Sequence, residues 1–493
     1  MNNTPPYEKL TLLDNFGHSL RSPAYLFQPT ETEEIGQALK LAKQHGLTIT
    51  LRGAGRSYND AALNGGGIVL DLRQVNRILA WDPATGLLRA EPGVTLEHLW
   101  HTVLPDGWWP PVVSGTMFTT LGGCLGMNIH GKNNFRVGTL GEHVLEFTIL
   151  LPTGAEVTCS PKKNGDLFRA CIGGMGMLGI FTSITLQMKK MASGLLEVHA
   201  FPVRSLEEHL EALLDGAPQH DYIVGWLDAT ARGKGLGRGQ IHTADYLHEG
   251  DGCQVRNHFG CQVRNHFGCQ VRNHFDPDPK KTLTVAYQTL PAKLFGVFPK
   301  SIIHYFMAPF MNNPGAWAVN TAKYVMGLRE SYYNQPHAAF HFLLDYVPDW
   351  ELAYGRNGLI QYQSFILKET AREAWTEMLE LSQRRGLPSY LGVTKRHRPD
   401  NFLLTHAVDG YSLALDFKVT SGNRSKMAQM LQDFDRITLE AGGRFYFAKN
   451  SETTAETAIR FLGEEAVAKF RSLKKRCDPH HLLESDLYRR VFG

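Results

Sequence analysis

The chain has 493 residues, of which 43% are hydrophobic and 20% are charged, as in an ordinary soluble globular protein. Lysine and arginine (51) almost balance aspartate and glutamate (48), so the net charge of +3 argues against a general nucleic-acid binder. At this length two domains are expected, because one hydrophobic core stops growing beyond roughly 250–300 residues. Seven cysteines are too few for a disulfide scaffold, and neither a secretory signal nor a membrane-spanning apolar run is found. These features predict a cytoplasmic enzyme.

The first part of the chain alternates short strands with helices and glycine-rich loops. Residues 29–46 predict a helix, because apolar residues recur at helical spacing and Gly46 follows them. An apolar segment then predicts a strand that runs into "RGAGRSYND" (52–60), and a second glycine-rich stretch occupies 114–144. This mixture indicates an α+β domain over residues 1–192 rather than a regular doubly wound sheet.

From about residue 193 the chain has longer alternating stretches, more aromatic residues and fewer glycines. "LLEVHAFPV", "HDYIVGWLDA", "LIQYQSFIL" and "GYSLALDFKV" predict strands, and "ETAREAWTEMLELSQRRG" predicts a helix. We therefore expect a substrate-binding domain over residues 193–435, with a large antiparallel sheet and flanking helices. A C-terminal segment over 436–493 completes the chain.

The octapeptide "GCQVRNHF" occurs three times without change, at 252–259, 260–267 and 268–275. Each copy carries one cysteine and one histidine, so the three copies together offer ligands for zinc. The alternative is a tandem duplication in a loop that tolerates added length, because loop closure costs little per added residue. The identity of the copies favours the duplication, and we predict no metal site.

The first glycine loop has the composition of an anion-binding loop. Two glycines, two arginines and a serine within 52–60 would present backbone N–H groups and positive charge to a phosphate. The loop lacks the lysine and serine of a nucleoside-triphosphate loop and the spacing of the common dinucleotide motif. Together with the second glycine stretch, it suits a long ligand with a central pyrophosphate.

Several motifs carry a resemblance to a known family. In chain order, "PTETEEI", "RGAGRSYNDAALN", "EPGVTLEHL", the "SGT…LGG" loop and "GGMGMLGI" resemble the FAD-binding domain of the vanillyl-alcohol oxidase/p-cresol methylhydroxylase (PCMH) superfamily. "IHGKNN", "GTLGEHV", "LIQYQ" and "RFYFAKNSETTAET" are similar to its decaprenylphosphoryl-ribose oxidase family, over all but roughly 250–335. The resemblance implies a two-subdomain FAD-binding domain of PCMH type. It also implies that 436–493 returns to the interface between FAD and the active site.

The resemblance further implies which residues bind the cofactor. Many relatives carry a histidine at the position of Arg56 and tether the flavin through it; a guanidinium is no nucleophile, so FAD is expected to be non-covalent. Cys124 lies close to the region that holds the cysteine link of other relatives. The cofactor-binding residues implied are Gly53, Ala54, Gly55, Arg56, Ser57, Tyr58, Asn59, Asp60, Gly115, Thr120, Leu121, Gly122, Gly123, Met127, Asn128, Ile129, His130, Ile180, Phe181 and Tyr446.

Carried over residue by residue, the resemblance implies an active site as well. The catalytic residues implied are Lys449, Lys395, Gln363 and His130, and the substrate pocket holds Tyr58, Trp226, Gln361 and Ser412. A lysine shielded beside a flavin could have a lowered pKa and act as a base. The alternatives are a solvated strand-end lysine for Lys449, a core aromatic for Trp226 and a structural histidine for His130. The sequence departs from the mycobacterial members at Ser412 and Ala414, where they carry Asn and Cys.

The expected reaction is FAD-dependent oxidation of the 2-hydroxyl of a polyprenyl-phosphate-linked pentose to a ketone. A separate NAD(P)H-dependent short-chain reductase would complete an epimerisation that supplies a cell-wall polysaccharide precursor. Two alternatives stay open: a sugar-alcohol or aldonolactone oxidase of the same superfamily, and a flavin-binding protein without turnover. "KRHR" (395–398) could hold a substrate phosphate or form a solvated face. The apolar segment 291–311 could dock a lipid tail, lie on a membrane surface as a peripheral contact, or form a core helix pair.

Overall fold

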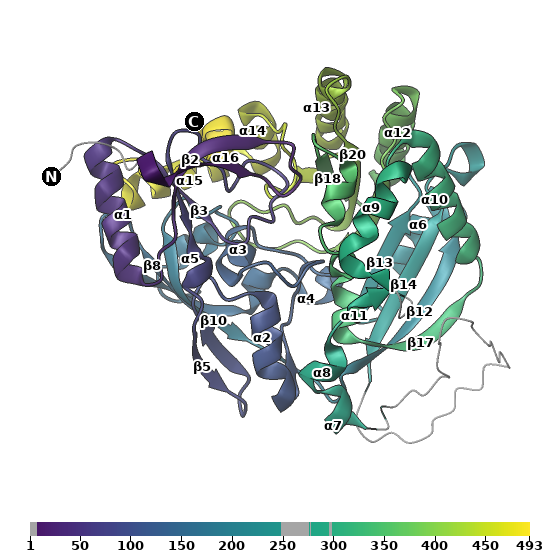
Figure 1. The fold of residues 1–493 in the computed structure, drawn as a ribbon, viewed down its shortest axis with the longest axis horizontal. Helices are drawn as coiled ribbons and strands as arrows, with labels where there is room; N and C mark the ends of the chain where they lie inside the picture. Colours follow the sequence, from purple (N-terminus) through teal and green to yellow (C-terminus); the bar gives the residue numbers. More distant parts are fainter. Residues whose placement is uncertain (1–6, 248–275, 277, 295–297) are drawn as a thin grey trace.

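The protein consists of two halves that lie side by side (Figure 1). The computed structural model describes residues 7–247, 276, 278–294 and 298–493. The "GCQVRNHF" copies lie outside the described residues, and so does the zinc site considered for them. Within the described part of the chain, no group of three or more His, Cys, Asp or Glu side chains is arranged to hold a metal ion.

The first half contains two sheets with helices around them. A four-stranded sheet has the order β1-β2-β4-β3, with β2 and β3 parallel to β4. A five-stranded antiparallel sheet has the order β5-β6-β10-β8-β9. The strands are β1 (Leu10–Asp14), β2 (Arg21–Phe27), β3 (Ile49–Arg52), β4 (Ile68–Asp71), β5 (Ile78–Asp82), β6 (Leu87–Ala90), β8 (Val144–Leu150), β9 (Glu156–Cys159) and β10 (Ile180–Gln187). The helices are α1 (Thr32–His45), α2 (Leu96–Val103), α3 (Leu121–Gly126), α4 (Asn134–Val137) and α5 (Gly165–Cys171).

The second half is built on an eight-stranded sheet of order β17-β12-β14-β13-β19-β20-β18-β21, in which all paired strands are antiparallel. Its strands are β12 (Leu195–Val203), β13 (Tyr222–Leu227), β14 (Gly239–Tyr246), β17 (Ser331–Pro336), β18 (Leu359–Leu367), β19 (Leu391–His397), β20 (Gly410–Lys418) and β21 (Arg444–Phe445). The helices α6 (Leu206–Gly216), α12 (Ala371–Arg384) and α13 (Arg424–Glu440) pack against it and against one another. The helices between β14 and β18 are α7 (Pro279–Thr282), α8 (Val285–Gln288), α9 (Ile303–Met307), α10 (Asn313–Met326) and α11 (His337–His341).

Two short strand pairs complete the fold, β7 (Trp108–Trp109) with β11 (Lys189–Lys190) and β15 (Lys293–Leu294) with β16 (Phe298–Pro299). The C-terminal helices are α14 (Ala455–Leu462), α15 (Glu464–Cys477) and α16 (Asp486–Phe492). These helices return to the first half, where Leu483 forms a parallel bridge with Ile49 of β3 (Figure 1). The return matters for function because β3 leads into the first glycine loop.

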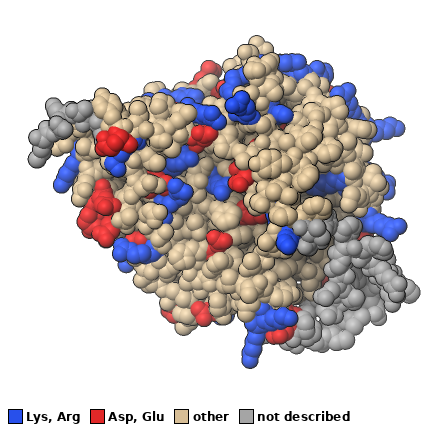
Figure 2. Space-filling view, viewed as in Figure 1, with Lys and Arg blue, Asp and Glu red and all other residues tan. Residues whose placement is uncertain are grey.

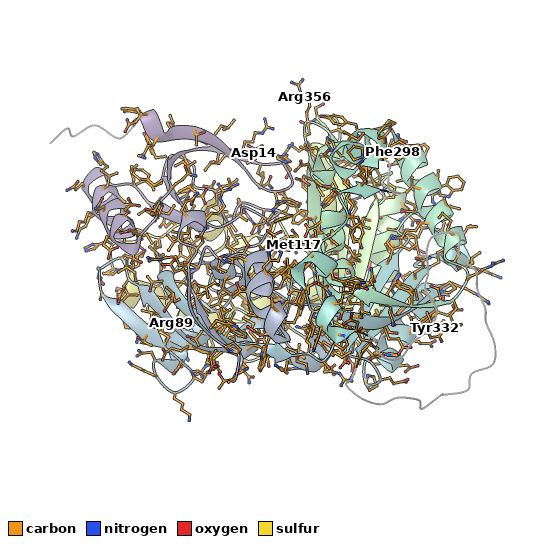
Figure 3. All side chains as sticks on the ribbon, turned by 60° about the horizontal axis from the view of Figure 1, so that its bottom comes forward. Asp14, Arg89, Met117, Phe298, Tyr332 and Arg356 are labelled. Carbon is orange, nitrogen blue, oxygen red and sulfur yellow. The ribbon has the colours of Figure 1, made fainter. Side chains whose placement is uncertain are left out.

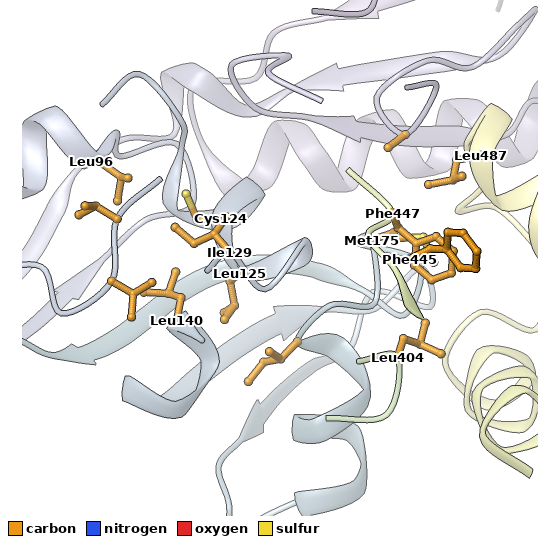
Figure 4. Packing of buried hydrophobic residues seen from close by; sticks show 14 of the residues in the cluster. Leu96, Cys124, Leu125, Ile129, Leu140, Met175, Leu404, Phe445, Phe447 and Leu487 are labelled. Carbon is orange, nitrogen blue, oxygen red and sulfur yellow. The ribbon is translucent and has the colours of Figure 1, made fainter. Parts of the chain in front are cut away.

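One buried core connects the N-terminal half to the C-terminal segment. Residues from the first half, such as Leu96 and Leu125, belong to the same apolar cluster as Phe445, Phe447 and Leu487 (Figure 4). The two halves are also linked by the backbone N–H of Met117, which donates to Oδ2 of Asp345 at 2.8 Å. Met117 lies near the middle of the molecule, where the halves meet (Figure 3).

The predicted α+β class with a large antiparallel sheet is confirmed. The helix expected over 29–46 is α1, and Gly46 ends it in the left-handed conformation with φ of 63°. No helix in the described part of the chain has the length and apolar composition needed to cross a bilayer.

Candidate active site

A cavity of about 310 Å³ lies between the two halves. Its walls come from the loop after β3, the stretch 113–132, residues 175–181, the strands β13, β18, β19 and β20, and the segment 446–449. Segments from all parts of the chain therefore meet at one place.

The sheet contributes to the cavity through one of its faces. Side chains alternate along a strand, so residues two apart share a face. Gln361 and Gln363 of β18 line the cavity, and in the antiparallel register Gln363 lies opposite Ala414 of β20. Lys395 of β19 lies opposite Ser412 of β20. The helices α6, α12 and α13 pack on the sheet, so the polar residues at these positions serve the cavity rather than the helix-packed core.

Glycines form much of the opposite wall. A Cβ added at Gly53 would lie 2.0 Å from Oγ1 of Thr120, so the two glycine loops approach as closely as their backbones allow. Gly55 and Gly176 have φ of 66° and 76°, a backbone conformation that residues with a side chain rarely adopt. Other glycines of the lining are Gly115, Gly122, Gly123 and Gly126. Exposed backbone from three segments gives a cradle that fits an elongated phosphate-bearing cofactor such as FAD.

The two arginines of the first loop have different positions. Arg52 donates to the backbone carbonyls of Asp14 and Ala62, so its guanidinium holds the loop in shape. Arg56 lines the cavity, and its guanidinium lies 5.0 Å from the ring centre of Phe16 and 5.7 Å from that of Phe118. Both arginines line the cavity, but the guanidinium of Arg52 is engaged by these two carbonyls, whereas that of Arg56 lies over aromatic rings.

Twenty of the predicted site residues line the cavity. They are Gly53, Ala54, Gly55, Arg56, Ser57, Tyr58, Gly115, Thr120, Gly122, Gly123, Met127, Ile129, His130, Phe181, Gln361, Gln363, Lys395, Ser412, Tyr446 and Lys449. The cavity thus brings together residues that are almost 400 positions apart in the sequence.

Six predicted site residues do not line the cavity: Asn59, Asp60, Leu121, Asn128, Ile180 and Trp226. Two of these residues belong to the first loop and bind other parts of the protein. Asn59 donates to the carbonyl of Phe447, and Asp60 forms an ion pair with Arg490. Asn128 accepts from the backbone N–H of Gly141, and Leu121 and Ile180 are fully buried in apolar clusters. Trp226 lies two residues beyond Val224, which does line the cavity.

Lys449 is held at the cavity by backbone contacts around it. The N–H of Tyr58 donates to the carbonyl of Ala448 at 2.9 Å, and Asn450 exchanges two hydrogen bonds with the backbone of Gln363. Nζ of Lys449 lies 3.8 Å from the ring centre of Tyr58. Burial lowers the pKa of Lys449 to about 7, although Asp416 opposes the shift. A neutral amine, able to accept a proton, is therefore accessible near neutral pH.

Two further amines lie in the same cavity. Burial lowers the pKa of Lys395 to about 8, and its Nζ is 3.5 Å from the carbonyl of His130. Lys132, which sequence reasoning missed, lines the cavity and donates to the carbonyl of Phe340. Its only sequence signal is its place in "IHGKNN", two residues after His130. Burial lowers the pKa of Lys132 as well, and an anionic ligand would stabilise the ammonium forms of Lys132 and Lys395.

Two histidines also line the cavity. Nε2 of His130 lies 3.2 Å from Nε2 of Gln363, and burial lowers the pKa of His130 well below its usual range. His341, a second residue missed from the sequence, also lines the cavity. Nδ1 of His130 and Nε2 of His341 are buried without a hydrogen-bond partner among the described residues. Buried polar atoms are normally paired, so these two fit contacts with a bound ligand.

Comparisons with known proteins agree with this geometry. The FAD binding domain family matches residues 23–160. The crystal structure of 6-hydroxy-D-nicotine oxidase from Arthrobacter nicotinovorans has the same fold, with a TM-score of 0.64 at 16% identity over 98% of this chain and 94% of that chain. The fold and the cavity therefore define an FAD-dependent oxidoreductase.

The relation to one oxidase extends over the whole chain. The protein is 31% identical over 483 residues to decaprenylphosphoryl-beta-D-ribose oxidase of Mycolicibacterium smegmatis, and the match covers 97% of each chain. L-Gulonolactone oxidase of Bos taurus is 29% identical over 165 residues, 34% of this chain and 37% of that one. The protein belongs to the decaprenylphosphoryl-ribose oxidase family, within the vanillyl-alcohol oxidase/p-cresol methylhydroxylase superfamily.

Proposed function

We propose that this protein oxidises the 2-hydroxyl of a polyprenyl-phosphate-linked pentose to a ketone. The observation that carries the proposal is the relation to decaprenylphosphoryl-beta-D-ribose oxidase over 97% of both chains. The amines of Lys132 and Lys395 support it, because burial lowers the pKa of both and a substrate phosphate in the cavity would stabilise their ammonium forms. The relation to L-gulonolactone oxidase spans only about a third of the chain, which favours the lipid-linked sugar over an aldonolactone.

The product would need a reductant to complete an epimerisation. A 2-keto sugar returns to an alcohol only by accepting a hydride, so we propose a separate NAD(P)H-dependent reductase as the next enzyme. The epimerised pentose would then serve as a precursor of a cell-wall polysaccharide.

Oxidation of an alcohol releases a hydride and a proton, and bound FAD supplies the acceptor for the hydride. The chain's own residues must handle the proton. We assign its acceptance to Nζ of Lys449, which is exposed to the cavity and has a pKa lowered to about 7. Gln361 and Gln363 present amide groups from β18 to the same cavity and would orient the substrate hydroxyls. Lys132 and Lys395 would hold the phosphate.

Asp416 acts on this proton acceptor from behind the cavity wall. It accepts a hydrogen bond from Nε2 of Gln361, and its Oδ2 is buried without a partner among the described residues. Its carboxylate raises the pKa of Lys449, because a nearby anion stabilises the ammonium form. Burial in turn raises the pKa of Asp416 to about 6.

The proposed roles predict a pH dependence that Asp416 controls. Anaerobic flavin reduction by substrate should become faster as the pH rises through the pKa of Lys449, because the neutral amine is the proton acceptor. In Asp416→Asn the stabilising anion is lost, so the pKa of Lys449 falls and the inflection moves to lower pH. Stopped-flow rates measured across the pH range would test this, with Asp409→Asn, which changes the residue directly before β20, as a control. An unmoved inflection would remove Asp416 from this role.

Attachment of the cofactor gives a second prediction. The Cys124 thiol lines the cavity, but burial raises its pKa to about 12, so it stays protonated and unreactive at neutral pH. Arg56 carries no nucleophile either. We expect acid precipitation of the protein to leave yellow FAD in the supernatant. Flavin that remains with the pellet of wild-type protein but not of Cys124→Ala would contradict this prediction.

The substrate itself is tested by an anaerobic screen that follows flavin absorbance. Glycosyl-phosphate polyprenols should bleach the flavin, while free sugar alcohols and aldonolactones should not. Bleaching by an aldonolactone alone would replace the proposed substrate class. Failure of every alcohol to bleach the flavin would favour a flavin-binding protein without turnover.

A further inference from the structure

The segment between β14 and β18 exposes an unusual number of large apolar side chains. Tyr305 and Phe306 of α9 are 70% and 62% exposed, and Phe310 and Trp317 are 51% and 57% exposed. The turn that holds Phe310 contacts both α9 and α10, so these four residues lie on adjacent elements. We refer to Tyr305, Phe306, Phe310 and Trp317 as the α9–α10 patch. Contiguous exposed apolar surface of this kind marks an interaction site.

The segment that carries the patch has charge of one sign. From residue 279 to 329 the chain has no aspartate or glutamate, and its charged residues are Lys280, Lys281, Lys293, Lys300, Lys323 and Arg329. Arg356 is exposed, follows the 3-10 helix Trp350–Tyr354 that packs on α9, and forms no ion pair with the described residues. In Figure 2 the surface over α9 and α10 is mostly tan, with blue along its margin. Aromatic residues bordered by basic ones are typical of a surface that binds anionic lipid headgroups.

The patch lies directly outside the wall of the cavity. Met311, one residue after Phe310, packs against a buried cluster that contains Phe16 and Tyr58, and both of these residues line the cavity. Leu343 lines the cavity and is also 53% exposed, so the cavity wall reaches the molecular surface at this residue. Phe298 and Arg356 lie on the same upper side of the molecule in Figure 3. The segment that carries the patch thus packs on the cluster that forms one wall of the cavity.

We propose that the α9–α10 patch docks this protein on an anionic lipid bilayer. The aromatic side chains enter the headgroup region, and exposed basic side chains such as Arg329 and Arg356 pair with lipid phosphates. Docking places the cavity next to the membrane. If the substrate is the lipid-linked sugar proposed above, its polyprenyl chain can then stay in the bilayer while the sugar phosphate enters the cavity; this last step rests on the proposed function.

Co-sedimentation of the flavin-loaded protein with vesicles tests the docking without any substrate. Wild-type protein should sediment with vesicles made of equal parts phosphatidylglycerol and phosphatidylcholine, and less with phosphatidylcholine alone. Added salt should weaken the binding, because it screens charge attraction at a surface. The double variant Tyr305→Asp/Phe306→Asp should bind the anionic vesicles about ten-fold more weakly or worse. The double variant Leu79→Asp/Leu145→Asp, which changes exposed apolar residues of β5 and β8, should bind as the wild type does.

Several outcomes would overturn the proposal. One is wild-type protein that stays in solution with anionic vesicles, and another is a patch variant that sediments as well as the control. A third is analytical ultracentrifugation that shows a wild-type dimer and a monomeric patch variant, which would make the patch a contact between two copies. Flavin reduction by detergent-solubilised substrate, measured in the patch variant, distinguishes a loss of docking from damage to the active site. Normal reduction with lost vesicle binding supports docking, whereas no reduction in any protein counts against the proposed function alone.

Discussion

Substitution of Lys449 by methionine is expected to slow flavin reduction by substrate by about 10²–10⁴-fold, the usual contribution of one positioned acid–base group. Methionine keeps much of the length and the apolar stem of lysine but cannot accept a proton. FAD should still bind, because the glycines that cradle it belong to other segments of the chain. The rate is measured by anaerobic stopped-flow absorbance on protein whose flavin content has been determined.

A matched control separates this role from a structural one. Lys368 follows β18, is partly exposed and pairs with Asp409, so Lys368→Met should keep a normal rate. A structural Lys449 would behave differently, because its loss would release FAD or make the protein insoluble. Near-normal reduction in flavin-loaded Lys449→Met would shift the proton-accepting role to Lys395 or His130.

Substitution of Lys474 by methionine is expected to lower the free energy of unfolding by about 3–5 kcal/mol, the usual result of removing one partner of a buried ion pair. Nζ of Lys474 lies 2.6 Å from Oδ2 of Asp478, and their side chains are 1% and 0% exposed. The same amine donates to the carbonyls of Met177 and Leu483. Loss of the amine leaves the Asp478 carboxylate buried without its counter-charge.

Loss of the Lys474 amine should lower FAD binding as well as stability. Lys474 fixes the turn that holds Leu483 beside β3, and β3 leads into the first glycine loop. We expect purified Lys474→Met to contain less FAD and to unfold at lower denaturant concentration than wild type. Lys475→Met changes the exposed neighbour and should alter neither quantity. Equal unfolding midpoints for the two variants would show that the buried pair contributes little.

The local elements and the cofactor loop follow from the sequence alone. Helix α1 follows from apolar spacing and a terminal glycine, and Thr95 caps α2 as its residue type and position suggest, by accepting from the N–H of His98. These features depend on neighbours within a few residues, so a short stretch of sequence is enough to predict them. The glycine loops and the family motifs likewise lie in short continuous stretches, and for this reason the sequence suffices to predict FAD as the cofactor.

The tertiary structure decided which side chains meet. Lys132 and His341 reach the cavity with Lys449 and Lys395 only because four distant segments converge there. Asp416 acquires its place behind Gln361 from the register of β18 against β20, which no local pattern encodes. Asn59 and Asp60 belong to the predicted loop, yet they form hydrogen bonds with residues more than 350 positions away and do not line the cavity.

The same division explains the segment 291–311. Its sequence is compatible with a lipid contact, a membrane surface or a core helix pair, because an apolar run carries no information about what covers it. In the structure, Met311 packs inward while Tyr305 and Phe306 are exposed. Local sequence therefore determined the helices, the strands and the glycine loops, whose geometry depends on adjacent residues. Burial, pairing and the shifted pKa of Lys449 depend on long-range packing, and only the tertiary structure decided them.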